Sequence, residues 1–361
     1  GALWLARPDP DRVRAATLVA DAEQARQTGV SEGAARAALA LEQAVRLDPA
    51  NAAAWGKLAL ARCALAEETA PDRVAAVTAQ VQESARRALD LNPRQPDALA
   101  ALAILPPYFG DWAAAEARMD AVVNVAPDHV ATRDARAFLY VSVGRVRENH
   151  AERLAITPRE PLNTILLYRL IYAHWIVGEV ASADRAAERA LQLWPQNPGA
   201  WLGRLWVLSF TGRAERALAQ LDDAAARPDL PPWMLETLRA SITAIATGRP
   251  ADRARATERL LGQVTRSPSA AVNALLLLNG LGETDRAFEV ARAYLLEEGP
   301  LMANVRWRPG QVLINDQRRR KTHMLFTPVA AAMRADPRFP ALADRLGLAA
   351  YWRAAGVQPG I

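Results

Sequence analysis

The chain of 361 residues has few of the residues that crosslink or anchor proteins. Cys63 is its only cysteine, so no intramolecular disulfide can form and cysteine usage indicates no redox compartment. Lys57 and Lys321 are its only lysines, so nearly all of the 44 basic residues are arginines. No apolar run approaches the roughly 18 residues that a membrane-spanning helix requires.

β-Branched residues are also sparse, because the 51% hydrophobic fraction is carried mainly by Ala and Leu. This composition predicts an all-α protein. The net charge is +5, but acidic and basic residues are interspersed along the whole chain. A nucleic-acid-binding face would cluster its basic residues, so we expect no nucleic-acid partner for this region.

Motifs for catalysis occur only in contexts that do not suit them. The string "GVSEG" at Gly29–Gly33 imitates a hydrolase nucleophile elbow, but an Ala-rich helical run precedes it where a strand is required. Ser31 fits a helix N-cap instead. The string "NGLGETD" at Asn279–Asp285 imitates a phosphate-binding loop, again with no strand before it. The sequence therefore predicts no enzyme, no catalytic residue and no cofactor.

Metal-binding spacing is absent as well. The histidines have no partner four residues away and no nearby cysteine pair, so we expect no zinc site and no other metal site. His174 lies close in sequence to Tyr172 and Trp175, and is expected either to line a groove with them or to be a structural histidine. The four histidines are His129, His150, His174 and His323.

Glycine, by contrast, recurs with a regular period. One series of glycines, each followed by a polar or charged residue, has successive spacings of 34, 34, 34, 36 and 34 residues. Glycine readily adopts the left-handed conformation that ends a helix and lets the chain reverse. Each glycine is therefore expected to join two antiparallel helices. The series is Gly110, Gly144, Gly178, Gly212, Gly248 and Gly282.

Prolines interleave with these glycines and are expected to stop the second helix of each pair, because proline cannot continue a helix. Trp55 and Trp201 each lie six residues after such a proline, and small Ala59, Ala103 and Ala137 fall where paired helices approach closely. The prolines are Pro49, Pro93, Pro127, Pro158, Pro195, Pro228 and Pro268.

A 34-residue period of helix, glycine turn, helix and proline resembles the tetratricopeptide repeat (TPR) family. The resemblance covers roughly residues 11–297, as about eight helix pairs. It implies a right-handed α-helical superhelix, or solenoid, whose stacked hairpins share one core and form a concave inner wall. The long interval from Pro49 to Pro93 is expected to lengthen the second pair. Residues 1–10 are interpreted as a linker or the stub of an upstream segment, residues 298–323 as an irregular loop and residues 324–361 as a C-terminal helical cap.

With the glycines setting the register, the first helix of each pair presents a mostly aromatic and apolar set of side chains to the concave wall. This groove is predicted to bind a peptide or an apolar small molecule, and to lack the Lys/Asn/Arg set by which some TPR domains clamp a terminal carboxylate. The alternative is that these side chains pack between repeats. The candidate binding residues are Asp134, Phe138, Tyr168, Tyr172, Trp175, Leu202, Trp206, Phe210, Leu238, Ile242 and Ile245.

The periodicity ends after Gly299. The basic run Arg318–Lys321 is interpreted as a solvated loop, with a phosphate-binding or targeting patch as the alternative. Apolar residues further on are expected to cover the open end of the solenoid. These are Phe326, Met333, Phe339, Leu342, Leu346, Leu348, Tyr351 and Trp352.

The C-terminal sequence carries a second resemblance. The strings "DPRF" at Asp336–Phe339 and "GLAAYW" at Gly347–Trp352 are similar to the ends of TPR domains in bacterial regulators that have a winged-helix domain and one transmembrane helix. Similar endings occur on repeat domains of adenylate-cyclase-like proteins. The final "QPGI" departs from the acidic, aromatic ending of those regulators. The apolar "ALWLA" near the N-terminus would then be the outer edge of a membrane anchor.

These resemblances imply a non-enzymatic protein–protein interaction domain or scaffold. It would be the sensor or partner-binding part of a bacterial envelope regulator, in the periplasm, or alternatively in the cytoplasm. Two other readings stay open: a self-occupied structural or dimerisation module with the C-terminal segment in the groove, and the regulatory domain of an adenylate-cyclase-like enzyme. The expected partner is a protein or peptide, with a homo-oligomer as a further possibility.

Overall fold

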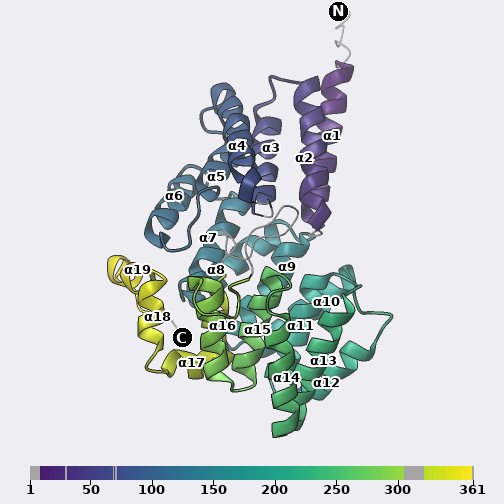
Figure 1. The fold of residues 1–361 in the computed structure, drawn as a ribbon. Helices are drawn as coiled ribbons and strands as arrows, with labels where there is room; N and C mark the ends of the chain where they lie inside the picture. The colour runs from purple at the N-terminus through teal and green to yellow at the C-terminus, as the bar shows by residue number, and fades with distance from the viewer. Residues whose placement is uncertain (1–8, 29–30, 68, 70, 305–320, 360–361) are drawn as a thin grey trace, which may run out of the picture. The chain divides into compact units, whose positions relative to one another are not determined.

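The computed structural model describes residues 9–28, 31–67, 69, 71–304 and 321–359. Contacts divide the chain into two compact units: Gly1–Pro106 with Arg118–Thr132, and Pro107–Ala117 with Arg133–Ile361. Every regular element of the described residues is helical (Figure 1), which confirms the predicted all-α class. Among the described helices, none has the length and apolar character needed to cross a membrane.

In the described part of the chain, eight successive helix pairs precede the C-terminal segment, which confirms the predicted number of hairpins. The pairs are α1 (Pro10–Gln27) with α2 (Ser31–Leu47), α3 (Ala52–Ala66) with α4 (Pro71–Leu91), α5 (Pro96–Ile104) with α6 (Trp112–Val125), α7 (Val130–Ser142) with α8 (Val146–Ile156), α9 (Thr164–Ile176) with α10 (Val180–Leu193), α11 (Pro198–Phe210) with α12 (Ala214–Asp222), α13 (Pro232–Thr247) with α14 (Pro250–Gln263), and α15 (Pro268–Gly280) with α16 (Thr284–Leu296).

All six glycines of the periodic series lie at the turns within the third to eighth pairs. Their φ angles are between +62° and +85°, in the left-handed region that glycine adopts without a steric penalty. At four of the six turns, those of Gly144, Gly178, Gly212 and Gly282, the N–H of the residue after the glycine donates back to a carbonyl of the first helix. The backbone N–H of Glu179 donates to the carbonyl of His174 at 2.8 Å, and that of Arg213 donates to the carbonyl of Leu208 at 3.1 Å. The predicted glycine turns are confirmed, and they fix where the second helix of each pair begins.

The prolines divide into two groups. Helices α2, α4, α6 and α10 each end two residues before a proline of the predicted series, as expected. Pro268 instead begins α15, and Pro158 lies inside the short 3₁₀ helix η1 (Thr157–Arg159). Proline is favoured at the first turn of a helix, where its missing N–H would have no partner. Pro228 comes six residues after the end of α12 at Asp222. The prediction that every proline in the series stops a helix was therefore wrong for Pro268.

The length of the second pair and the burial of several residues agree with the sequence-based expectations. Helix α4 has 21 residues and accounts for the long interval of the second pair. Ala59 and Ala137 are fully buried, as expected where helices approach closely. Trp201 is only 2% exposed and lies in α11.

The C-terminal segment consists of η2 (His323–Phe326), η3 (Pro328–Ala330), α17 (Ala331–Ala335), α18 (Phe339–Arg345) and α19 (Leu348–Ala355). It packs against α15 and α16 of the last pair (Figure 1). Seven of the eight apolar residues predicted for a cap are buried: Phe326, Met333, Phe339, Leu342, Leu346, Leu348 and Tyr351.

The same segment also reaches the beginning of α6 and the turn between α7 and α8. The indole N–H of Trp112 donates to the carbonyl of Leu346 at 2.9 Å, and that of Trp352 donates to the carbonyl of Val143 at 2.7 Å. The side chain of Phe326 lies against Gly144, where an added Cβ would come within 2.8 Å of the ring. The segment therefore joins two distant parts of the second unit and does more than cover the last pair.

The glycine turns can be tested at Gly212, where an added Cβ would meet no atom within 4 Å but φ is +76°. We expect Gly212→Ala to lower the free energy of unfolding by about 1–2 kcal/mol, because the left-handed conformation is strained for alanine. Gly262 is exposed in α14 and its Cβ would also meet nothing. As a matched control, Gly262→Ala should raise stability by about 0.5–1 kcal/mol. Urea unfolding followed by circular dichroism measures both, and effects of the same sign would contradict the turn assignment.

Candidate functional site

A cavity of about 330 Å³ lies in the second unit, between the first helices of several pairs. Its walls come from α7, α8, α9, α11 and α15, together with the chain at residues 321–324. Four of the predicted groove residues line it: Phe138, Tyr168, Tyr172 and Leu202. The glycine-based register therefore predicted part of this wall.

Several aromatic rings line the cavity. Tyr168 and Tyr172 meet edge to face with ring centroids 6.5 Å apart. The ring of His323 lies 5.3 Å from that of Phe138, and the Lys321 ammonium lies 4.9 Å from the same ring. Tilted rings and a cation over a ring face are both favourable arrangements.

Cationic and amide side chains also line the cavity, and Arg169 lies 5.7 Å from the Phe138 ring. Asn149 and Arg153 come from α8, Arg169 from α9, Asn273 from α15 and Lys321 from the C-terminal segment. The prediction that the groove lacks a Lys/Asn/Arg set was therefore wrong for this cavity. It left out two polar residues of the first helices, Arg169 and Asn273. It also did not consider the second helix α8 or the chain at Lys321.

Asp134 holds two of these cations in place. Its carboxylate forms ion pairs with Arg153 and Arg169. Burial by itself raises the pKa of Asp134, but the positive charges of Arg169 and Arg153 outweigh it and lower the pKa to about 2. Because this carboxylate stays ionised at neutral pH, Asp134 acts as the counter-ion of the cavity's arginines.

The remaining apolar candidate residues do not line this cavity, although Trp175 contacts Tyr172 with ring centroids 6.4 Å apart. Trp206 is 1% exposed, and Phe210 stacks on both Trp206 and Trp175, with ring centroids 6.1 Å and 5.8 Å away. Leu238 lines a separate cavity of about 320 Å³ beside Trp233. The alternative interpretation, packing between helices, fits these residues better than a groove does. They are Trp175, Leu238, Ile242, Ile245, Trp206 and Phe210.

The cavity has a neutral histidine at its edge. Burial, followed by the positive charges of Lys321 and Arg169, lowers the pKa of His323 to about 3. In the predicted basic run, Lys321 lines the cavity, whereas residues 318–320 lie outside the described residues. Thr322, between Lys321 and His323, donates its hydroxyl hydrogen to the carbonyl of Ser142 at 2.7 Å.

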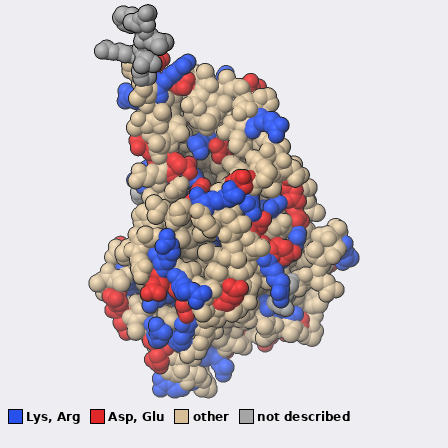
Figure 2. All heavy atoms as spheres, turned by 180° about the vertical axis from the view of Figure 1, so that it is seen from behind, with Lys and Arg blue, Asp and Glu red and all other residues tan. Residues whose placement is uncertain are grey.

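The other sequence motifs take structural roles. Ser31 begins α2, while Gly29 and Val30 of the "GVSEG" string lie outside the described residues. Gly282 is the turn of the last pair, and Thr284 begins α16. On the face that Figure 2 shows, basic and acidic residues alternate without a broad patch of one sign. That mixture agrees with the interspersed charges of the sequence.

One group of polar side chains escaped the sequence reasoning. His150, His174 and Glu179 come together although 24 and five residues separate them along the chain. The spacing rules applied to the sequence look for histidines one helical turn apart. Two histidines on neighbouring helices satisfy no such rule, but Glu179 directly after a repeat glycine was a usable signal.

The helix pairs and their glycine turns define a TPR-like array of helical hairpins. No family model matches the chain, and no curated protein matches it. Solved structures with the same kind of architecture include a tetratricopeptide repeat protein from Parabacteroides merdae, with 18% identity over 69% of this chain and 91% of that one, and a TM-score of 0.39. Yeast Tom70 has 12% identity over 96% of this chain and 69% of that one, with a TM-score of 0.41.

A third similar structure is that of PilF from Pseudomonas aeruginosa, with 12% identity over 59% of this chain and 91% of that one, and a TM-score of 0.38. Identities and TM-scores this low carry no information about binding or activity. The assignment of the fold therefore rests on the eight helix pairs and their left-handed glycines.

The ion pairs of Asp134 can be tested through their pH dependence. Because the folded-state pKa of Asp134 is lowered from 3.8 to about 2, its contribution is present above pH 4 and is lost as the pH falls towards 2. The shift corresponds to about 2 kcal/mol. We expect Asp134→Asn to lower the free energy of unfolding by at least that amount at pH 7. The difference in free energy of unfolding between the variant and the native chain should become smaller as the pH falls towards 2. Urea unfolding between pH 2 and 7 measures this.

Asp222 is a matched control, since it pairs with Arg239 at 2.7 Å but both side chains are at least half exposed. Asp222→Asn should change stability by less than about 0.5 kcal/mol at any pH. Equal losses for Asp134→Asn and Asp222→Asn would show that the buried pairs make no special contribution.

Proposed function

We propose that this chain is a non-enzymatic interaction domain that binds a peptide segment in the cavity of its second unit. The peptide would place an apolar or aromatic side chain against Phe138, Tyr168 and Tyr172, and a carboxylate towards Arg169 and Lys321. The observation that carries this proposal is that aromatic rings and cationic side chains line one cavity of about 330 Å³.

Charge balance favours an acidic group in the ligand. Three cationic side chains line the cavity, Arg153, Arg169 and Lys321, and a single carboxylate, that of Asp134, pairs with the two arginines. No carboxylate of the described residues pairs with Lys321. An added carboxylate would therefore meet an excess of positive charge in a partly buried site, where charge-assisted hydrogen bonds are strong.

The volume of the cavity and its aromatic lining favour a ligand that carries an apolar side chain beside that carboxylate. Ligand sites are commonly clefts of about 300–1,000 Å³ lined by aromatic residues with a few placed polar groups. A single aromatic side chain buries about 150–250 Å² and finds edge-to-face partners in the tyrosines. The C-terminal end of a peptide carries both features, a carboxylate and neighbouring side chains.

A peptide library with free C-terminal carboxylates, compared with its amidated copy, tests this function. The native chain should select peptides with apolar or aromatic residues near the free carboxylate, and amidation should abolish the selection. Lys321→Ala should weaken the binding of the selected peptides by about 3- to 10-fold, because it removes one ion pair that is partly exposed to solvent. Fluorescence anisotropy with labelled peptides measures the affinities.

Lys57 provides the matched control, because it is the other lysine of the chain and lies in the first unit, near Glu23 and Asp97. Lys57→Ala should leave affinity unchanged. Leu202→Trp should block the cavity, whereas Leu193→Trp on the exposed side of α10 should not. Binding that ignores amidation, Lys321→Ala and Leu202→Trp alike would refute a peptide site in this cavity.

The second candidate is a self-occupied structural module, and the position of the C-terminal segment favours it. Lys321, His323 and Met324 line the cavity from within the chain. In this case the segment serves as the permanent ligand of its own array, and the unit interacts with partners through its outer faces or through a second copy of the chain.

Removing residues 324–361 distinguishes the two functions. Self-occupancy predicts that the truncated chain binds the peptide library more tightly than the native chain. A segment that only completes the core predicts no gain, with faster amide hydrogen exchange in α15 and α16, which the segment covers. Hydrogen exchange by mass spectrometry and the same anisotropy assay give both readouts.

The C-terminal strings suggest a wider setting for either function. Phe339 of "DPRF" is 6% exposed, and Tyr351 and Trp352 of "GLAAYW" bond to Glu116 and Val143. They anchor the segment, and on their resemblance we propose the partner-binding part of a bacterial envelope regulator in the periplasm. A cytoplasmic location and an adenylate-cyclase-like protein are the alternatives. The full N-terminal sequence of the gene product distinguishes them.

A further inference from the structure

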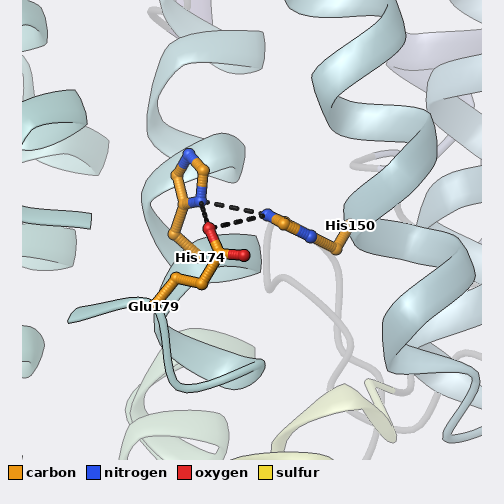
Figure 3. Close-up of side chains that lie close together, drawn as sticks. All are labelled: His150, His174 and Glu179. Atoms are coloured by element: carbon orange, nitrogen blue, oxygen red, sulfur yellow. Dashed lines mark hydrogen bonds and ion pairs between the residues drawn. The ribbon is translucent and has the colours of Figure 1, made fainter. Parts of the chain in front are cut away.

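Three metal-ligating side chains converge on one point between the fourth and fifth helix pairs (Figure 3). Nε2 of His150 lies 3.0 Å from Nδ1 of His174. Oε2 of Glu179 lies 3.1 Å from Nδ1 of His174 and 3.7 Å from Nε2 of His150. All three residues belong to the second unit, His150 on α8, His174 on α9 and Glu179 directly before α10.

The repeat itself brings these residues together. The turn at Gly178 returns the backbone so that Glu179 lies beside His174, to whose carbonyl its N–H donates. His150 is the sixth residue after Gly144, the turn glycine of the preceding pair. Its side chain crosses from α8 to the first residue after the next turn glycine (Figure 3).

The neighbouring pairs use the same two positions for ordinary ion pairs. Glu116, six residues after Gly110, pairs with Arg145 at 2.7 Å. Asp184, six residues after Gly178, pairs with Arg213 at 2.8 Å. Each of these contacts joins a carboxylate to a guanidinium, so its charges and hydrogen bonds are satisfied within the chain.

Between them, the contact of His150 with Glu179 has an imidazole in place of the guanidinium. A third ligand is added because His174 stands where the other turns have Tyr140 and Leu208, four residues before the glycine. Arg145 covers the ring of Tyr140, with its guanidinium carbon 4.4 Å from the ring centroid. One contact of a repeated series has thus acquired two imidazoles and a carboxylate.

The three facing atoms have too few protons for one another. A neutral imidazole nitrogen either donates or accepts, and a carboxylate only accepts. If Nε2 of His150 donates to Nδ1 of His174, then the lone pair of that Nδ1 is used and Glu179 receives no hydrogen from either ring. If Nδ1 of His174 instead donates to Glu179, then Nε2 of His150 has only that same hydrogen to accept. Glu179 makes no side-chain cap to α10, although it is the N-cap residue. Its carboxylate is turned towards the histidines instead.

A divalent cation resolves this shortage. A point about 2 Å from all three atoms lies slightly off the plane of their triangle, which is the distance and pyramidal placement of tetrahedral zinc with nitrogen and oxygen ligands. The side chains of His150 and His174 are 12% and 10% exposed, whereas Glu179 is 50% exposed and leaves a fourth position open to water.

We propose that His150 Nε2, His174 Nδ1 and Glu179 Oε2 form a binding site for a late first-row divalent cation, Zn²⁺ first among them. Two imidazoles and one carboxylate are a donor set that suits this class of ion. Binding displaces the proton shared by the rings and ties α8 to the turn between α9 and α10. The cation would therefore crosslink two consecutive hairpins, independently of any ligand in the cavity.

The test uses the full chain, stripped with a chelator and titrated with Co²⁺ and then Zn²⁺. We expect one Co²⁺ per chain with the intense visible absorption of a tetrahedral site, its loss when Zn²⁺ displaces Co²⁺, and a higher Tm with Zn²⁺. His150→Gln should abolish the absorption and the Tm shift. Glu179→Gln, a change to an exposed side chain, should weaken Co²⁺ binding by at least about tenfold.

Two variants provide matched controls. Arg213→Gln removes the residue that corresponds to Glu179 in the next pair, and His129→Gln removes a histidine bonded to Asp97 and Thr132 in the first unit. Both should bind Co²⁺ as the native chain does. The proposal is overturned if the native chain shows no absorption and no Tm shift with excess metal, or if folded His150→Gln and Glu179→Gln bind as the native chain does.

Discussion

The constraint on which this structure depends is a backbone with positive φ at one residue in about every 34. A left-handed glycine follows the first helix of a pair, and at four of the six turns the next N–H donates to the carbonyl four residues before the glycine. That hydrogen bond sets where the second helix starts. Because the turn is repeated almost unchanged, each pair offers the same faces to its neighbours, and stacked pairs share a core that none could form alone.

Repetition also explains why polar contacts recur between successive pairs. The sixth residue after one turn glycine and the first residue after the next meet as Glu116 with Arg145 and as Asp184 with Arg213. A substitution in one pair changes the chemistry of that contact without changing its geometry. His150 and Glu179 occupy these positions between the two ion pairs, so a rigid scaffold holds a different set of donor atoms in place.

The C-terminal segment departs from the repetition and gives the second unit its specific features. Hydrogen bonds from Trp112 and Trp352, at opposite ends of the sequence of this unit, tie the segment to α6 and to the turn after α7. The same segment brings Lys321 and His323 to the wall of the cavity. The repeats supply the aromatic rings, Arg153 and Arg169, and the C-terminal segment adds a third cation, Lys321.

The sequence alone determined the all-α class, the eight pairs and the six glycine turns. It also pointed to Phe138, Tyr168, Tyr172 and Leu202, which line the cavity. These features depend on local conformation and on a period, and both can be read along the chain. Only the tertiary structure placed Arg153 and Lys321 in the same cavity as those rings and buried Trp206 outside its lining. It also joined His150 to His174 and Glu179. Such contacts depend on how helices and a non-periodic segment pack through space, and a period along the chain carries no information about distances across it.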